Sequence, residues 1–371
     1  MVLLKLSDKL FMRGMIHMRK NKVFLTVNQL EPGMIIAEDF IQENIILVHS
    51  DVVLTEIIIS KLREKYFLDK VLVYRDDEAD VNQSKDPKEK TVEDIDQSFN
   101  EFSFNVGGIF HSMYNEGICD IEGIRGFSKK IQGELKSTSA VIKNIVLYGS
   151  GNDVIYRHSV NVAALSSILG RWIGLDENTI NLLTYSAILH DYGKTKVDKD
   201  ILNKVNPLTK NEIKEIKGHP VIGYNEIKKV QFLDNSVGYG VLMHHERLDG
   251  SGYPLGIKED KIHPFAKIIA IADVFDAVNS NRVHKKSRGP FEALEIIQKE
   301  SLGKLDYKYC KIFLEHIVNY YMGENVLLNT NKVCKIEQIN INDISRPLLF
   351  DGSVFIDLKQ EKELNVEELV L

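Results

Sequence analysis

The sequence predicts a mainly helical bundle, preceded by a small α/β domain and followed by a short β extension. Three observations lead to this prediction. Apolar residues recur at helical spacing through most of residues 93–325, as in NVAALSSILGRWIGL at 161–175 and PFAKIIAIADVFDAV at 264–278. Short runs rich in β-branched residues alternate with turns in residues 24–75. Strand-like runs return after residue 325, in NVLLNT, KVCKIEQINI and SVFIDL.

The length of 371 residues is enough for two or three domains. We assign residues 1–78 to a small N-terminal α/β domain, a candidate regulatory domain. Residues 79–92 are assigned to a linker, because DDEADVNQSKDPKEKT at 76–91 is almost free of large apolar residues. A helical connector at 93–145, a bundle with the candidate site at 146–325 and a β extension at 326–371 follow.

The N-terminal domain contains both strand-like runs and a helical spacing of apolar residues. The runs FLTV, MIIA, IILV and VLVY predict strands, and Pro32-Gly33 predicts a turn between the first two. Between the third and fourth runs, Ile58, Ile59, Leu62 and Tyr66 follow a helical spacing. We therefore expect a helix over residues 55–66, within an α/β arrangement.

Composition excludes several classes of protein. Lys and Arg total 47 against 53 Asp and Glu, so the net charge of −6 argues against binding a nucleic acid polymer. The three cysteines form no CxxC pair, which argues against a disulfide framework and suits a reducing compartment. Neither a signal peptide nor a membrane-spanning run of apolar residues is recognised. These features predict a cytoplasmic protein.

Histidine and aspartate cluster in the bundle region. Of the eleven histidines, five stand at positions 158, 190, 219, 244 and 245. A single histidine is more often a packed or surface residue than a ligand. Asp273 is different, because it lies among Ile271, Ala272, Val274 and Phe275, and a carboxylate buried on such a helix needs a cation. Asp276, three residues on, shares its helix face.

This set of side chains indicates transition-metal chemistry. Imidazole together with carboxylate suits iron, manganese or zinc. Adjacent residues such as His190-Asp191 and His244-His245 cannot easily reach one ion together, so they favour two neighbouring ions with a bridging carboxylate. Such pairs of ions assist displacement at phosphorus and lower the pKa of a bound water.

Two motifs resemble a known family. LHDYGK at 189–194 is similar to the signature of HD phosphohydrolases, and HHERLDGSGYPLGI at 244–257 is similar to the extended GYP signature. The similarity runs from about residue 156 to 300 with the motifs in family order. The chain therefore resembles the HD-GYP family, whose members cleave cyclic di-GMP within an HD-type helical bundle. The resemblance implies seven metal ligands: His158, His190, Asp191, His219, His244, His245 and Asp273.

The resemblance also implies the cofactors and the reaction. Two divalent transition-metal ions are expected, iron or manganese first, with zinc, nickel or cobalt as further candidates. Asp191 would bridge them, and a bridging hydroxide would attack the phosphodiester to give linear pGpG. Some members hold a third metal through a glutamate four residues before the first histidine. Val154 stands there, so two ions are expected and further conversion to GMP is in doubt.

Family resemblance assigns substrate contacts to four residues. Lys194 would contact phosphate and assist the leaving oxygen, Arg282 and Lys285 would hold phosphate and guanine, and Asp276 would contact guanine or a water. The usual Pro-Tyr pair after the arginine is replaced by Val283-His284, which weakens the substrate assignment. A solvated lysine and an ordinary basic loop remain the alternatives for these positions.

The GYP loop contains Gly252, Tyr253 and Pro254, which we expect to shape the rim of the pocket. In some relatives this loop is a docking surface for a diguanylate cyclase, and the same partner is expected here. The helices of residues 95–145 are a candidate surface for a homodimer. Three alternatives remain open: hydrolysis of another cyclic dinucleotide, a cyclic di-GMP receptor without turnover, and a scaffold that acts through the GYP loop.

Overall fold

The computed structural model describes residues 21–31, 33–42, 45–50, 52, 54–66, 70–75, 90–117, 120–151, 153, 155–230, 233–280 and 290–370. The chain divides into two compact units, residues 1–88 and 89–371. Among the described residues, no helix combines the length and the apolar character needed to cross a membrane. Each unit has its own apolar core.

The first unit is a small α/β structure. Strands β1 (Asn21–Thr26), β5 (Lys70–Arg75) and β2 (Ile35–Ile36) form an antiparallel sheet in that order, and β3 (Phe40–Gln42) pairs with β4 (Ile45–Val48). Helix α2 (Glu56–Tyr66) matches the expected helix, and its Ile59 and Leu62 are buried. The 3-10 turn η1 (Val27–Gln29) follows β1. The predicted turn at Pro32 lies outside the described residues.

The second unit begins with helices α3 (Val92–Asn115), α4 (Ile121–Glu134) and α5 (Thr138–Tyr148). They are followed by α6 (Tyr156–Trp172), α7 (Glu177–Leu189), η4 (Tyr192–Lys196), α8 (Lys199–Leu202), α9 (Lys210–Ile216), α10 (His219–Ile227) and α11 (Asn235–Met243). The last helices are α12 (Pro264–Asn279), α13 (Glu292–Glu300) and α14 (Tyr307–Ile317). Short 3-10 turns are η3 (Leu135–Ser137), η5 (Glu259–Lys261) and η6 (Val318–Tyr320).

Local sequence explains where several helices begin. Thr91 caps α3 in a reciprocal pair with Asp94, and Asp176 caps α7 by accepting from the Thr179 amide. Pro264 occupies the first position of α12, where no intrahelical donor is needed. These residues fix the starts of α3, α7 and α12, and α12 carries Asp273 and Asp276.

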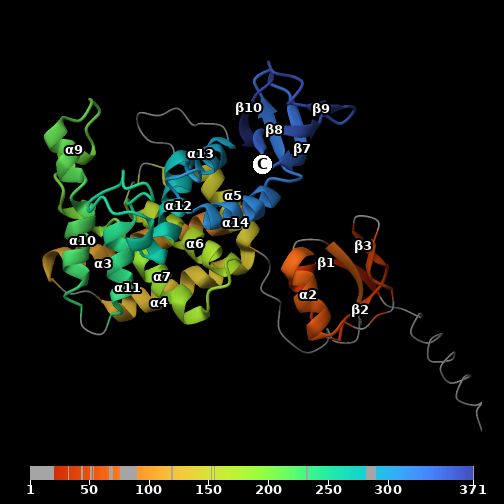
Figure 1. The fold of residues 1–371 in the computed structure, drawn as a ribbon, viewed down its shortest axis with the longest axis horizontal. Coiled ribbons are helices and arrows are strands. Elements are labelled where there is room, and N and C mark those ends of the chain that lie inside the picture. Colours follow the sequence, from red (N-terminus) through yellow and green to blue (C-terminus); the bar gives the residue numbers. More distant parts are fainter. Residues whose placement is uncertain are drawn as a thin grey trace, which may run out of the picture. The chain divides into compact units, whose positions relative to one another are not determined.

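Helix α6 is the central element of the bundle. Residues 157–170 of this helix are all buried, because α6 packs against α3, α5, α7, α12 and α14 (Figure 1). A helix that is enclosed on every side belongs to the core of a domain. Its polar residues therefore face other protein groups rather than water.

The C-terminal β extension is a five-stranded antiparallel sheet of order β10-β6-β7-β8-β9. Its strands are β6 (Asn325–Leu328), β7 (Val333–Asn340), β8 (Asp343–Phe350), β9 (Phe355–Asp357) and β10 (Val366–Val370). Val326, Leu328 and Ile336 belong to the same apolar core as the helices. The predicted fold class, a helical bundle with small β-containing parts before and after it, is confirmed.

Candidate metal centre

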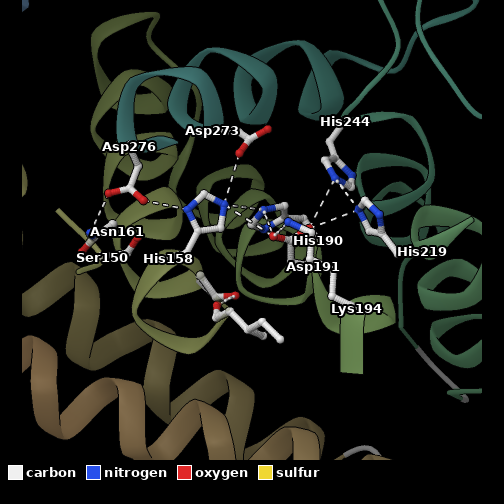
Figure 2. A network of polar contacts seen from close by, with 12 residues as sticks. Ser150, His158, Asn161, His190, Asp191, Lys194, His219, His244, Asp273 and Asp276 are labelled. Atoms are coloured by element: carbon white, nitrogen blue, oxygen red, sulfur yellow. Dashed lines mark hydrogen bonds and ion pairs between the residues drawn. The ribbon is translucent and has the colours of Figure 1, made fainter. Parts of the chain in front are cut away.

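Helix ends position most of the predicted ligands. His190 and His244 follow the last residues of α7 and α11, and His219 is the first residue of α10. Asp191 precedes η4, whereas His158 lies in the first turn of α6. Figure 2 shows these side chains converging between the helices, with Asp273 reaching in from α12.

One group of potential ligands consists of His158, His190 and Asp273. One nitrogen or oxygen atom from each lies within 4.8 Å of the others. The Nε2 atoms of His158 and His190 are 3.3 Å apart, and His158 Nε2 is 3.1 Å from Asp273 Oδ1. These separations are short enough for the three atoms to share one ion.

A second group consists of Asp191, His219, His244 and His245, again within 4.8 Å of one another. The Nε2 atoms of His219 and His244 are 3.3 Å apart, and His219 Nε2 is 3.1 Å from Asp191 Oδ1. His245 Nδ1 also lies 3.7 Å from Asp273 Oδ2, so this residue faces both groups.

The Asp191 carboxylate lies between the two groups. Its Oδ1 faces His219, while its Oδ2 is 3.5 Å from His158 Nε2 and 3.4 Å from His190 Nε2. The side chain is buried, and Oδ1 receives no hydrogen bond from the described residues. A buried carboxylate oxygen without a donor is costly unless a cation lies beside it.

In three histidines the second ring nitrogen forms a hydrogen bond with a carbonyl oxygen at the end of a helix. The Nδ1 atoms of His190, His219 and His244 each lie 2.7 Å from a carbonyl oxygen three residues earlier. These carbonyls belong to the last turns of α7, α9 and α11, where intrahelical donors are absent. Because a carbonyl only accepts, Nδ1 must carry the proton, and Nε2 presents a lone pair to the site.

His158 is oriented by a carboxylate instead. Its Nδ1 lies 2.6 Å from Asp276 Oδ2, and Asp276 Oδ1 accepts from the Asn161 amide at 2.7 Å. Ser280 also donates to Asp276, at 3.3 Å. The expected contact of Asp276 with guanine or water is not what this geometry supports. The carboxyl group is fully buried behind His158, and both of its oxygens are engaged.

These tautomers make the cluster suitable for cations. In His219 and His244 the ring proton is on Nδ1, where it is donated to a backbone carbonyl. Their two Nε2 atoms, 3.3 Å apart, therefore face each other with lone pairs and without a proton between them. Two such lone pairs repel each other unless a positive ion lies against them. The donor set of imidazole nitrogen and carboxylate oxygen is the one that divalent transition metals prefer.

Electrostatics keeps most of the groups in the state that binds metal. Burial, reinforced by neighbouring imidazoles, holds the pKa of His244 well below its usual value, and burial does the same for the pKa of His245. Burial would raise the pKa of Asp191, but Lys194 and His190 hold it well below the usual range. His244 and His245 are therefore held neutral beside an ionised Asp191.

His158 and Asp273 form the other charged pair. Burial alone would lower the pKa of His158, but its hydrogen bonds with Asp273 and Asp276 raise it to about 9. Burial would raise the pKa of Asp273, but its hydrogen bond with His158 keeps it well below the usual range. A cation between Asp273 and His158 would take the place of the proton on Nε2.

Lys194 contacts the centre from η4. Its Nζ lies 2.5 Å from Asp191 Oδ2, and its side chain is partly exposed. The preceding Gly193 is required by close packing, since a Cβ there would lie 2.0 Å from the carbonyl oxygen of His219. Glycine at this position lets the two ligand-bearing segments approach each other.

The GYP loop folds back on the second group. The Tyr253 ring stacks on His245 with centroids 4.6 Å apart, and Gly252 packs so closely on the backbone of Glu246 that a Cβ would lie 2.4 Å from its Cα. The Glu246 carboxylate accepts from the amides of Leu255 at 2.6 Å and Ile257 at 3.2 Å. Pro254 continues the loop beyond Tyr253, and Glu246 holds the loop rather than facing the centre.

Some predicted positions lie outside the described residues. These are Arg282 and Lys285, which were expected to bind substrate, together with Val154, Val283 and His284. Sequence reasoning missed Asn161, which holds Asp276 in place. Its signal was present, since Asn161 lies one turn after His158 and is followed on the same face by the apolar Ala164, Leu165 and Ile168.

Comparison with known proteins relates part of this chain to a known domain family. Residues 144–308 match the HD domain family. A cyclic di-GMP phosphodiesterase of Pseudomonas aeruginosa is 32% identical over 51% of this chain and 46% of its own length. The PdeB cyclic di-GMP phosphodiesterase of Borreliella burgdorferi is 31% identical over 52% of this chain and 50% of its own. A 3′3′-cGAMP-specific phosphodiesterase of Vibrio cholerae is 32% identical over 51% of this chain and 43% of its own.

The chain thus spans about half the length of the curated relatives it matches. A solved structure extends the fold comparison beyond the matched region. The HDG"Y"P protein of Bdellovibrio bacteriovorus aligns with 79% of this chain and 98% of its own, with a TM-score of 0.50 and 18% identity. That similarity concerns the fold alone. Residues 144–308 therefore form an HD domain, and this part of the chain is similar to cyclic dinucleotide phosphodiesterases.

Proposed function

We propose that this protein is a metal-dependent phosphodiesterase that hydrolyses cyclic di-GMP to linear pGpG. The observation that carries the proposal is the position of Asp191, whose two carboxylate oxygens face two separate groups of histidine and aspartate ligands. Relatives that match about half of the chain are cyclic dinucleotide phosphodiesterases. Both facts favour hydrolysis of a phosphodiester.

Two divalent transition-metal ions fit the donor set. His158, His190 and Asp273 would hold one, and His219, His244 and His245 the other, with Asp191 shared. Iron and manganese are the first candidates, because imidazole with carboxylate suits both. When bound, such ions neutralise charge on a phosphoryl group and make water a better nucleophile at neutral pH.

The chain's own residues would position the substrate and the ligands. The Lys194 ammonium lies beside Asp191 and is partly open to solvent, so it can approach a phosphate oxygen and supply a proton to the leaving oxygen. Asp276 holds the His158 ring through Nδ1, which keeps Nε2 directed toward the centre. Tyr253 covers His245 and limits the access of water on that side.

Product analysis tests this function. The full chain, loaded anaerobically with Fe²⁺ or Mn²⁺, is incubated with cyclic di-GMP and with 3′3′-cGAMP, and the products are separated by chromatography. We expect pGpG from cyclic di-GMP, and no product from the Asp191→Asn variant. Faster hydrolysis of 3′3′-cGAMP would favour the specificity of the Vibrio cholerae relative. Tight binding of either compound without any product would contradict the proposal and favour a receptor.

Two partners expected from the sequence also belong to this proposal. The GYP loop exposes Leu255, half open to solvent beside Tyr253, which is suited to contact a diguanylate cyclase domain. A homodimer through the helices of residues 95–145 is the second expectation. Purification of the full chain with a cyclase domain, and its mass in solution, test the two separately.

A further inference from the structure

A large cavity lies beside the metal centre, outside the ligand cluster. Its volume is about 880 Å³, within the usual range for sites that bind small molecules. Helix α3 forms one wall, and the start of α6 together with η4 and α8 forms the other. Lys194 lines this cavity, and its Nζ also contacts Asp191. One residue therefore connects the cavity to the centre.

Two glycines in the middle of α3 contribute open space to the cavity. Gly107 and Gly108 both line it, although adjacent glycines weaken the interior of a helix. A Cβ on Gly107 would meet only the Tyr156 ring at 3.7 Å, and a Cβ on Gly108 would meet nothing within 4 Å. Packing does not require glycine at either position. The space that side chains would fill is available to a ligand.

The walls suit a flat aromatic ligand. Phe104 lines the cavity with 82% of its surface exposed, and Tyr114 and Tyr156 lie on the same walls. His111 and Asn115 also line it, with the Asn115 amide nitrogen 2.8 Å from the His111 ring. Aromatic side chains stack on nucleobases, and an amide side chain can both donate to and accept from the edge of a base.

Positively charged side chains in the lining suit an anion. Lys194 and Lys199 line the cavity, whereas its acidic residue, Asp153, is engaged in capping α6. The Asp153 carboxylate accepts from the amides of Tyr156 at 2.7 Å and Arg157 at 3.0 Å, and from the Ser103 hydroxyl at 2.7 Å. A phosphate beside Lys194 would leave the aromatic side chains of the lining for the rest of the ligand.

We propose that this cavity binds a purine base of the nucleotide substrate, and that α3, which precedes the matched HD domain, supplies the contacts to that base. The inference rests on the proposed function for the identity of the substrate. It goes beyond that function because it assigns recognition of the base to α3. Phe104 would stack on the base, and the open space beside Gly108 would accommodate it.

The test compares two ligands that differ only by the base. GMP carries guanine, ribose and phosphate, and ribose 5-phosphate lacks the guanine; neither contains a diester bond. Binding of each to the manganese-loaded full chain is measured by calorimetry. We expect GMP to bind about tenfold more tightly, since stacking of one base on an aromatic ring has an effect of that order.

Two variants locate the base. Gly108→Leu should weaken GMP binding about tenfold by filling the cavity, and Phe104→Ala should weaken it by removing a stacking surface. Both should leave ribose 5-phosphate binding unchanged. The matched controls are Gly126→Leu, also an open glycine on an exposed helix face, and Phe355→Ala, also an exposed phenylalanine. Melting temperatures of all four variants report whether the fold is preserved.

The outcomes separate this inference from the proposed function. Unchanged GMP binding in both cavity variants overturns the base site, as does an equal loss of GMP and ribose 5-phosphate binding. Wild-type protein that binds GMP no better than ribose 5-phosphate also overturns it. Intact cyclic di-GMP after incubation, with base-dependent GMP binding preserved, overturns the phosphodiesterase function alone.

Discussion

At the scale of single residues, the site depends on groups that orient the ligands as much as on the ligands. His190, His219 and His244 obtain their orientation from helix-end carbonyls, which no side-chain substitution removes. His158 differs, because its Nδ1 contacts a side-chain carboxylate, that of Asp276. The first group of ligands is therefore the one that a single substitution outside the ligand set can disturb.

Asp276→Asn should weaken metal binding without removing a ligand. An amide at this position no longer fixes the His158 tautomer with a charged acceptor, and loss of such an orienting partner typically lowers metal affinity by about 10- to 100-fold. Competition with a chelator measures the affinity. The control is Glu246→Gln, also a buried carboxylate beside the centre, whose oxygens accept from loop amides instead. Equal affinities for the two variants would contradict the orienting role.

At the scale of elements, a buried arginine connects α3 and α5 to α6. Arg157 is 5% exposed, and its guanidinium donates to Asp96 at 2.9 Å, Asn100 at 2.6 Å and Asn144 at 2.8 Å. It precedes His158, and its Nε also donates to Asn161 at 3.3 Å. The connector helices are thus joined by polar contacts to the helix that carries a ligand.

Arg157→Met should destabilise the second unit by about 2 to 3 kcal/mol, because it leaves Asp96 and Asn144 without their charged donor. The value lies at the low end for buried pairs since Asp96 is partly exposed. Chemical denaturation measures the change. Arg125→Met, which breaks the exposed pair with Glu122, should change the stability by less than about 1 kcal/mol. An equally small change in stability for Arg157→Met would show that the guanidinium does not stabilise the packing of α3 and α5 on α6.

The packing of α14 on α6 makes stability depend on pH. His316 of α14 stacks on Trp172 of α6 at 4.8 Å, and burial lowers the pKa of His316 to about 4. In the unfolded chain histidine takes up a proton near pH 6.5. The stability that neutral His316 contributes is therefore complete above pH 6.5 and declines as the pH falls from 6.5 toward 4.

His316→Phe should reduce this pH dependence while keeping the stacked ring. Between pH 7.5 and 5.5 the metal-free variant should lose about 1 kcal/mol less unfolding free energy than the wild type. Denaturant titrations at the two pH values give the comparison, and other histidines cancel because both proteins share them. Identical losses in the two proteins would mean that His316 is protonated equally in the folded and unfolded states.

At the scale of the whole molecule, the features predicted correctly are those that depend on residues close together in the sequence. Period and turn signals predicted α2 and the bundle, and the spacing of His190-Asp191 and His244-His245 indicated ligands for two ions. Strand β8 was missed, since Arg346 and Pro347 interrupt its apolar alternation and Pro347 is unusual inside a sheet. A neighbouring register irregularity in β7 accompanies it.

The orienting role of Asp276 and the cavity beside α3 could not be read from local pattern. Asp276 meets His158 across 118 positions of sequence, and Lys194 meets the residues of α3 only because η4 packs against that helix. Such contacts depend on how helices pack rather than on which residues are neighbours in the chain. Gly107 and Gly108 are visible in the sequence as two adjacent glycines inside a predicted helix, which they should destabilise. Only the tertiary structure shows that the space beside them belongs to a cavity.

The most direct test of the metal centre is the number of transition-metal ions bound per chain after anaerobic reconstitution with Fe²⁺ or Mn²⁺, measured by elemental analysis. Because the ligands form two groups joined by Asp191, the wild type should hold about two ions, His158→Ala about one, and Asp191→Asn close to none. A reconstituted wild type without bound transition metal would contradict the account, and so would an Asp191→Asn variant that retains both ions.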